Sequence, residues 1–73
     1  MYDVNTKNAN IEWLINKKIL VNLRIDEKIE GILVGFDQFL NLVLDKSDLL
    51  VGNEKKSIGI VLIRGNNITS IEQ

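Results

Sequence analysis

The spacing of apolar residues changes abruptly near Lys18, and this change constrains the fold more than any other feature of the sequence. Upstream, Ile11, Leu14 and Ile15 recur three and four residues apart, as on one face of a short amphipathic helix of about two turns. Asn10 stands directly before this run and can serve as its N-cap. The sequence therefore predicts a short helix that starts near residue 10.

Downstream of Lys18 the apolar period becomes two, which is the period of a half-buried strand. Ile19, Val21, Leu23 and Ile25 carry this alternation through the first strand. Further strand-like segments follow at similar spacing, separated by polar turn residues. The predicted strands are residues 19–25, 29–36, 40–44, 58–63 and 68–71, and residues 45–57 are predicted to form a hairpin with a loop at its tip.

Gly31 and Gly35 both fall within the second predicted strand. Glycine inside a strand often marks a sharp bend or a close approach of two backbones, so we expect a strongly curved sheet. Five antiparallel strands joined by short turns most naturally close into a small barrel. The predicted fold is mainly all-β: a short N-terminal helix, which caps one open end, followed by a five-stranded, strongly bent antiparallel sheet that forms a small open barrel.

The edges of such a sheet need partners, because an edge strand carries unpaired backbone N–H and C=O groups. Residues 58–63 are apolar almost throughout, as expected of a strand that is covered on both faces. The last strand carries no charge before Glu72, and the chain has no Pro to protect either edge. We therefore expect both edge strands to pair with other subunits, and head-to-tail pairing of this kind generates a ring when the rotation closes.

Composition narrows the class of protein. The 73 residues allow one small domain, placed at residues 10–73, after a polar and flexible segment at residues 1–9. Neither Cys nor His is present, so we expect no disulfide, no metal site and no cofactor. The net charge of −1, taken alone, argues against nucleic-acid binding. No apolar run reaches the ~18 residues that cross a membrane, and no signal peptide is visible, so the chain is predicted to be soluble and intracellular.

Two segments resemble the motifs of a known family. Residues 31–44 (GILVGFDQFLNLVL) resemble the first Sm motif, which has a strand, Gly, Asp, an aromatic residue, Asn and a second strand. Residues 58–66 (IGIVLIRGN) resemble the second Sm motif, an apolar run that ends in Arg-Gly. The two motifs follow the predicted helix in the order typical of the Sm and Sm-like family. The resemblance covers roughly residues 10–72.

The resemblance implies a binding site for single-stranded RNA on two loops. In the first loop, Phe39 is expected to stack on a base and Asn41 to bond the edge of that base, while Asp37 supports the loop. In the second loop, Arg64 is expected to stack on the same base or contact phosphate, and Gly65 and Asn66 to shape the turn and add polar contacts. Stacking on aromatic and guanidinium planes is how proteins read unpaired bases.

Local chemistry by itself leaves other interpretations open for these residues. Asn41 is an ordinary turn residue, and Asp37 commonly forms an Asx-turn. Phe39 is a candidate for the core, because most aromatic side chains are buried. Arg64 next to Gly65 is equally consistent with a tight turn and a solvated side chain. Only the two motifs together favour the RNA-facing interpretation.

The function implied by the resemblance is that of an RNA-binding subunit in a heteroheptameric Sm ring. Such a ring binds a uridine-rich site in small nuclear RNAs and forms the core of the spliceosomal ribonucleoproteins of pre-mRNA splicing. The partners implied are paralogous Sm subunits, paired through the fourth and fifth strands, in the nucleus after cytoplasmic assembly. The alternatives are an Sm-like ring subunit in RNA processing or decay, and a structural ring subunit with little RNA contact. No membrane and no small-molecule substrate are expected. No enzymatic activity is expected, because His and Cys are absent and the carboxylates lie mostly at turns rather than converging in a cleft.

Overall fold

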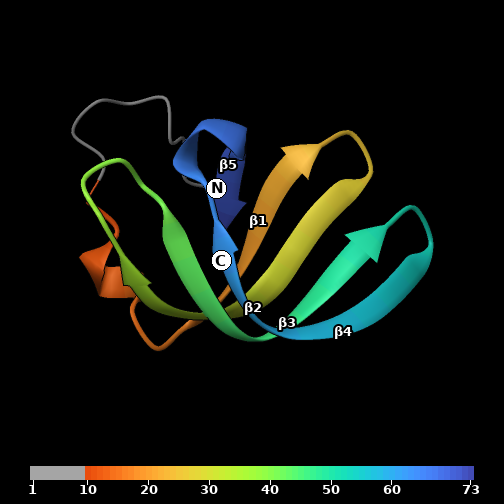
Figure 1. The fold of residues 1–73 in the computed structure, drawn as a ribbon, viewed down its shortest axis with the longest axis horizontal. Helices are drawn as coiled ribbons and strands as arrows, with labels where there is room; N and C mark the ends of the chain where they lie inside the picture. The colour runs from red at the N-terminus through yellow and green to blue at the C-terminus, as the bar shows by residue number, and fades with distance from the viewer. Residues whose placement is uncertain (1–9) are drawn as a thin grey trace.

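The computed structural model describes residues 10–73, which form one antiparallel sheet with strand order β4-β3-β2-β1-β5 (Figure 1). The sheet is strongly bent, and two single-turn 3-10 helices, η1 and η2, accompany it (Figure 1). The segment predicted to be flexible, residues 1–9, lies outside the described residues. The elements are η1 (Glu12–Leu14), β1 (Lys18–Arg24), β2 (Glu27–Phe36), β3 (Leu42–Val51), β4 (Glu54–Ile63), η2 (Gly65–Asn67) and β5 (Ser70–Glu72).

The N-terminal helix is shorter than predicted, with three residues in place of about two turns. Asn10 does support its start, because its side-chain oxygen accepts a hydrogen bond of 3.0 Å from the Glu12 N–H. The helix ends at Leu14 because Ile15 is already extended (ψ 134°), and Asn16 then takes a left-handed backbone (φ 69°). The Asn16 N–H donates to the Leu33 carbonyl oxygen at 2.8 Å, so sheet pairing replaces further helical bonds.

The strands differ from the predicted bounds mainly at turns. β3 and β4 are ten residues each and continue to the tip of their hairpin, so little of the predicted loop remains beyond the Gly52 turn. β3 starts at Leu42, and not at Leu40, because Leu40 has a left-handed backbone (φ 58°). Ile25, predicted to continue the apolar alternation of β1, lies in the turn and is 94% exposed.

Gly31 permits a close approach of β2 and β3. A Cβ atom at Gly31 would lie 2.6 Å from the Ser47 Oγ and 3.1 Å from the Asp45 carbonyl oxygen. The register between β2 and β3 shifts here, between Glu30 and Ile32. A second shift lies next to Gly35, but a Cβ at Gly35 would meet no atom within 4 Å. The predicted bend is therefore present, and only Gly31 is required by close packing.

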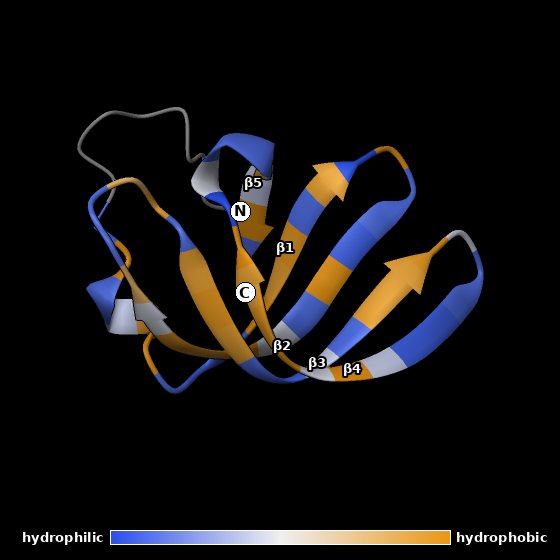
Figure 2. Cartoon of the chain, in the orientation of Figure 1, coloured by the Kyte–Doolittle hydropathy of each residue, from blue (hydrophilic) through white to orange (hydrophobic). Residues whose placement is uncertain are grey.

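The core lies inside the curve of the sheet and is entirely apolar apart from Ser47. Its residues come from η1 and its flank and from all five strands and the turn before β5, and apolar and polar bands alternate along the strands (Figure 2). No helix of the described part of the chain is long and apolar enough to cross a membrane. The buried apolar residues are Ile11, Leu14, Ile19, Val21, Ile29, Leu33, Leu42, Leu44, Ile63, Ile68 and Ile71.

β4 and β5 are the two edge strands, as expected. The prediction that β4 is covered on both faces is wrong for the single chain, because Ile60 is 72% and Leu62 60% exposed. These two side chains point away from the core because the alternating partners, Val61 and Ile63, supply the inner face. The apolar character of β4 therefore leaves an open apolar surface on the edge of the sheet.

Candidate nucleic-acid interface

The β2–β3 loop is organised around the carboxylate of Asp37. One oxygen of Asp37 accepts hydrogen bonds from the Phe39 N–H at 2.9 Å and the Asn41 N–H at 3.0 Å. The other oxygen accepts from the Asn41 side-chain Nδ2 at 2.8 Å. The backbone closes the same turn, since the Leu40 N–H donates to the Asp37 carbonyl oxygen at 3.0 Å. These contacts gather the loop around one carboxylate.

The hydrogen bonds to Asp37 favour its charged form. The side-chain hydrogen bond from Asn41, followed by the backbone N–H of Asn41, holds the pKa of Asp37 below its ordinary value of 3.8. Desolvation opposes these two hydrogen bonds, and smaller effects of the Phe39 N–H and the positive charge of Arg64 lower the pKa further. The loop is therefore braced by an ionised carboxylate at neutral pH.

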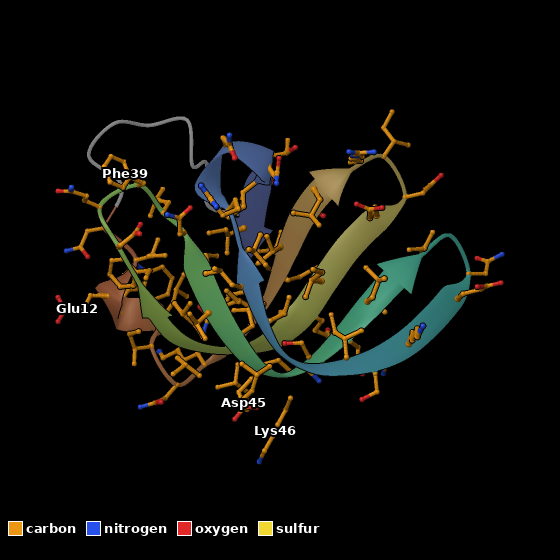
Figure 3. All side chains as sticks on the ribbon, in the orientation of Figure 1. Glu12, Phe39, Asp45 and Lys46 are labelled. Atoms are coloured by element: carbon orange, nitrogen blue, oxygen red, sulfur yellow. The ribbon has the colours of Figure 1, made fainter. Side chains whose placement is uncertain are left out.

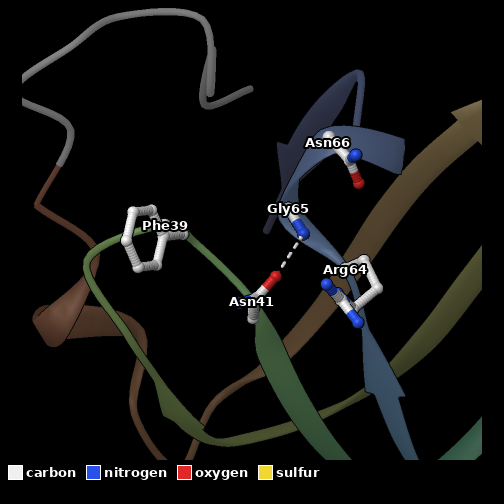
Figure 4. A pocket seen from close by; sticks show the side chains of 5 residues that line it. All are labelled: Phe39, Asn41, Arg64, Gly65 and Asn66. Carbon is white, nitrogen blue, oxygen red and sulfur yellow. Dashed lines mark hydrogen bonds between the residues drawn. The ribbon is translucent and has the colours of Figure 1, made fainter.

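A second loop, between β4 and β5, is held against the first through Asn41 and Gly65. The Gly65 N–H donates to the Asn41 side-chain oxygen at 2.8 Å (Figure 4). Gly65 also packs so closely that a Cβ atom there would overlap the Phe39 carbonyl oxygen. No other residue type has room at this position without moving the loops apart. The Arg-Gly step of the sequence thus joins the two loops.

A cavity of about 440 Å³ opens between the loops, and Figure 4 shows its lining. The structure brings together all five of the residues predicted to contact a ligand, while Asp37 braces the loop from outside the lining. Phe39 is 71% exposed and points outward from the tip of its loop (Figure 3), so the core interpretation of this side chain is wrong. The lining residues are Phe39, Asn41, Arg64, Gly65 and Asn66.

The polar groups of the cavity have unused hydrogen-bonding capacity. Asn41 uses one hydrogen of its Nδ2 on Asp37 and one lone pair of its Oδ1 on Gly65. One donor hydrogen and one acceptor lone pair of the amide remain unused, and uracil offers both a carbonyl acceptor and the N3–H donor. Arg64 is exposed and takes part in neither ion pair of the described residues. The cavity thus combines one oriented amide with two flat side chains for stacking.

The structure also reveals features that the sequence did not single out. Trp13 is 52% exposed, and the Lys17 Nζ lies 5.7 Å from its ring centroid. A second polar cavity adjoins the first beyond Asn66 and includes Arg24. No group of three or more acidic side chains within residues 10–73 is placed to hold a metal ion. The second cavity is formed by turns that are distant in the sequence, so the sequence alone could not indicate it.

Known proteins resemble this chain in both sequence and structure. Residues 9–73 match the LSM domain family. The chain is 47% identical over 58 residues to a "Probable small nuclear ribonucleoprotein G" of Medicago sativa, covering 80% of this chain and 72% of that relative. Its fold resembles a heptameric archaeal Sm protein with TM-score 0.78 and 34% identity, covering 84% and 90% of the two chains. A Pyrococcus abyssii Sm protein in complex with a uridine heptamer has TM-score 0.79 and 33% identity, with 85% and 89% covered.

Proposed function

The chain belongs to the LSM domain family, and from this premise we propose that it is an RNA-binding subunit of a heteroheptameric Sm ring. The ring binds a uridine-rich single-stranded site in small nuclear RNAs and forms the core of spliceosomal ribonucleoproteins in pre-mRNA splicing. The name of the Medicago relative supports the G subunit of that ring. The archaeal heptamer and the uridine complex support the ring and its ligand. We infer nuclear localisation, with assembly in the cytoplasm.

The observation that carries this proposal is the convergence of two distant loops on one cavity. Phe39 and Asn41 come from the β2–β3 loop, and Arg64, Gly65 and Asn66 follow β4. In the proposed complex a uracil stacks between Phe39 and Arg64, and the Asn41 amide bonds its edge. A stacked base contributes about 1–3 kcal/mol, so one cavity binds weakly. Seven cavities acting together on one strand supply the affinity.

The ring itself follows from the two open edges of the sheet. β4 and β5 lie at opposite ends of the strand order, so β4 of one subunit can pair with β5 of the next. The exposed Ile60 and Leu62 of β4 become buried in that arrangement. Paralogous Sm subunits are the proposed neighbours. The chain has no proposed catalytic role, because binding by stacking and edge recognition needs no reacting group.

The proposal is tested by RNA binding to the ring reconstituted with its Sm partners, with oligouridine as the probe. Phe39→Ala removes an exposed side chain and should weaken binding about fivefold to 150-fold, the equivalent of one stacked base. Phe39→Trp keeps an aromatic plane and should retain most of the affinity. Arg64→Ala and Asn41→Ala should also weaken binding.

The control for these variants is Lys46→Gln, which removes an exposed charge that points away from the cavity (Figure 3). Assembly of each ring is checked by native mass spectrometry before affinity is measured. Unchanged affinity for the Ala variants at all three positions, in correctly assembled rings, would refute the RNA role of this subunit. The structural ring subunit would then be the better assignment.

A further inference from the structure

A second cavity, of about 340 Å³, lies next to the first and shares one residue with it. Asn66 lines both cavities, so the two cavities adjoin at this residue. The second cavity lies between the η2 turn and the end of the β1–β2 hairpin. Its lining residues are Leu23, Arg24, Glu27, Asn66, Asn67, Ile68 and Thr69.

The lining of this second cavity suits a sugar–phosphate group better than a base. The side chains of Arg24, Asn66 and Asn67 form no hydrogen bond or ion pair with any residue of the described chain, and all three are exposed. They present one guanidinium and two carboxamides to a ligand. Leu23 and Ile68 supply apolar surface behind them, and no aromatic ring is present for stacking.

The wall of the second cavity is held in place by sheet contacts. The Thr69 hydroxyl donates to the Leu23 carbonyl oxygen at 2.9 Å, and the Thr69 N–H donates to the Asn22 carbonyl oxygen at 2.8 Å. These bonds tie the η2–β5 segment to β1, so Asn67 and Arg24 keep a fixed relation across the cavity. A preorganised wall loses little conformational entropy when a ligand binds.

We propose that the RNA strand runs from the first cavity across Asn66 into the second, where Arg24 binds the phosphate of the neighbouring nucleotide. The carboxamides of Asn66 and Asn67 hydrogen-bond that phosphate and its ribose. This inference rests on the proposed RNA-binding function and extends it from one base to two successive nucleotides. Arg24 is thereby assigned a role in affinity and in salt dependence, because a neutralised phosphate releases counterions.

Glu27 lines the same cavity, and its negative charge provides a second, independent test of the proposal. Glu27 pairs with Arg24 in the β1–β2 register, and the two side chains form no ion pair. Its carboxylate repels a bound phosphate, so its charge opposes binding while that of Arg24 favours it. Neutralising either residue should therefore change RNA affinity, with opposite signs.

The experiment measures oligouridine affinity of the reconstituted ring across a range of salt concentrations. Arg24→Gln should weaken binding about threefold at low salt and reduce the slope of log affinity against log salt by about 0.7, the value for one phosphate on a single strand. Glu27→Gln should tighten binding. The matched controls, Lys46→Gln and Glu54→Gln, remove the same charges at exposed positions outside both cavities and should have little effect.

The outcomes separate this inference from the proposed function. If Phe39→Ala weakens binding while Arg24→Gln and Glu27→Gln match their controls, the second cavity does not contact RNA and the inference is overturned. If Arg24→Gln weakens binding but Phe39→Ala does not, the second cavity does not extend the first, which also overturns it. If Arg24→Gln and Glu27→Gln change oligouridine affinity by the same amounts as Lys46→Gln and Glu54→Gln, the effect comes from the overall charge of the ring. That result would also refute a local phosphate contact.

Discussion

At the scale of single residues, the candidate site depends on how Asn41 divides its side-chain amide. Its nitrogen donates to Asp37 within the same loop, and its oxygen accepts from Gly65 in the other loop. Because both ends are anchored, the amide cannot rotate to suit a ligand, and its remaining donor and acceptor keep one orientation. Asp37 supports this arrangement without lining the cavity. Asp37 and Gly65 therefore fix the orientation of the Asn41 amide at the edge of the cavity.

The ionised state of Asp37 predicts an acid-dependent loss of stability. Hydrogen bonds lower the folded-state pKa below 3.8, so the stabilisation is fully present above that ordinary value. It is lost as pH falls through the lowered folded-state pKa. Asp37→Asn lacks the charge and should be less stable than the natural chain at neutral pH, with the difference shrinking in acid. Urea unfolding from about pH 7 to about pH 2 measures both curves.

Glu54→Gln is the control for this comparison, since the Glu54 side chain is exposed and takes part in neither ion pair of the described residues. It should leave the pH dependence of unfolding close to that of the natural chain. If the curves of the natural chain and of Asp37→Asn remain parallel down to about pH 2, the carboxylate does not brace the loop in the way described.

At the scale of elements, the bend of the sheet depends on the pairing of β2 with β3. Gly31 of β2 lies against Ser47 of β3, where the register between the strands shifts. The Ser47 hydroxyl is buried and has no hydrogen-bond partner among the described residues. It fills the space that a Cβ on Gly31 would need. The bend therefore depends on the lack of a side chain at residue 31, because a Cβ atom there would prevent this contact.

This contact predicts a coupling between residues 31 and 47. Gly31→Ala should destabilise the chain by about 1–3 kcal/mol, because the added methyl group overlaps the Ser47 Oγ. Ser47→Ala should be close to neutral or stabilising, because it removes a buried hydroxyl without a partner. The double variant should recover part of the loss. A double-mutant cycle of unfolding free energies measures the coupling.

Gly35→Ala is the matched control, because a Cβ at Gly35 would meet no atom within 4 Å and its backbone is not left-handed. It should change the free energy of unfolding little, or stabilise the chain slightly by restricting the unfolded state. Strict additivity of Gly31→Ala and Ser47→Ala would show that the Ser47 hydroxyl is not the obstacle at residue 31.

At the scale of the whole molecule, the chain has features of a subunit. Its two edge strands are free, and exposed Ile60 and Leu62 follow the β4 edge. Long apolar edges promote association, and natural proteins usually protect them or pair them. A ring in which β4 meets β5 of the neighbour uses both edges of every subunit. The cavities are then repeated around a common centre, where a single RNA strand can visit successive subunits.

The edge contact predicts a charge substitution that blocks assembly and leaves the fold intact. Ile60→Lys should prevent incorporation into the ring, because burial of an unpaired ammonium between β4 and its neighbour is costly. The single chain should still fold, since this side chain is 72% exposed in it. Native mass spectrometry of the mixed subunits measures incorporation, and far-UV circular dichroism checks the fold.

Ile25→Lys is the control, because Ile25 is 94% exposed at the β1–β2 turn and lies on neither edge strand. This variant should enter the ring as the natural chain does. Efficient incorporation of Ile60→Lys would contradict pairing through β4.

Much of the fold was predictable from the sequence because local patterns of residues specify the strands and turns. The period of two predicts strands, turn residues separate them, and an apolar fourth strand indicates an edge that needs a partner. The misplaced boundaries have a common cause. Asn16, Asp26 and Leu40 adopt left-handed backbones that end or delay an element, and no pattern of apolar residues records that choice. The spacing of apolar residues predicts which face of a strand is buried, but it does not predict where the backbone turns.

The sequence by itself determined the strand number, the antiparallel order and, through two motifs, the residues of the first cavity. Only the tertiary structure decided that Phe39 faces outward, that Asn41 bonds Gly65, and that Arg24 lies beside Asn66 in a second cavity. The physical reason is that strand alternation is local, whereas contact between loops depends on the register and bend of the whole sheet. Residues 41 and 65 meet because β3 pairs antiparallel with β4 and places Leu42 opposite Ile63, so the β2–β3 and β4–β5 loops emerge side by side.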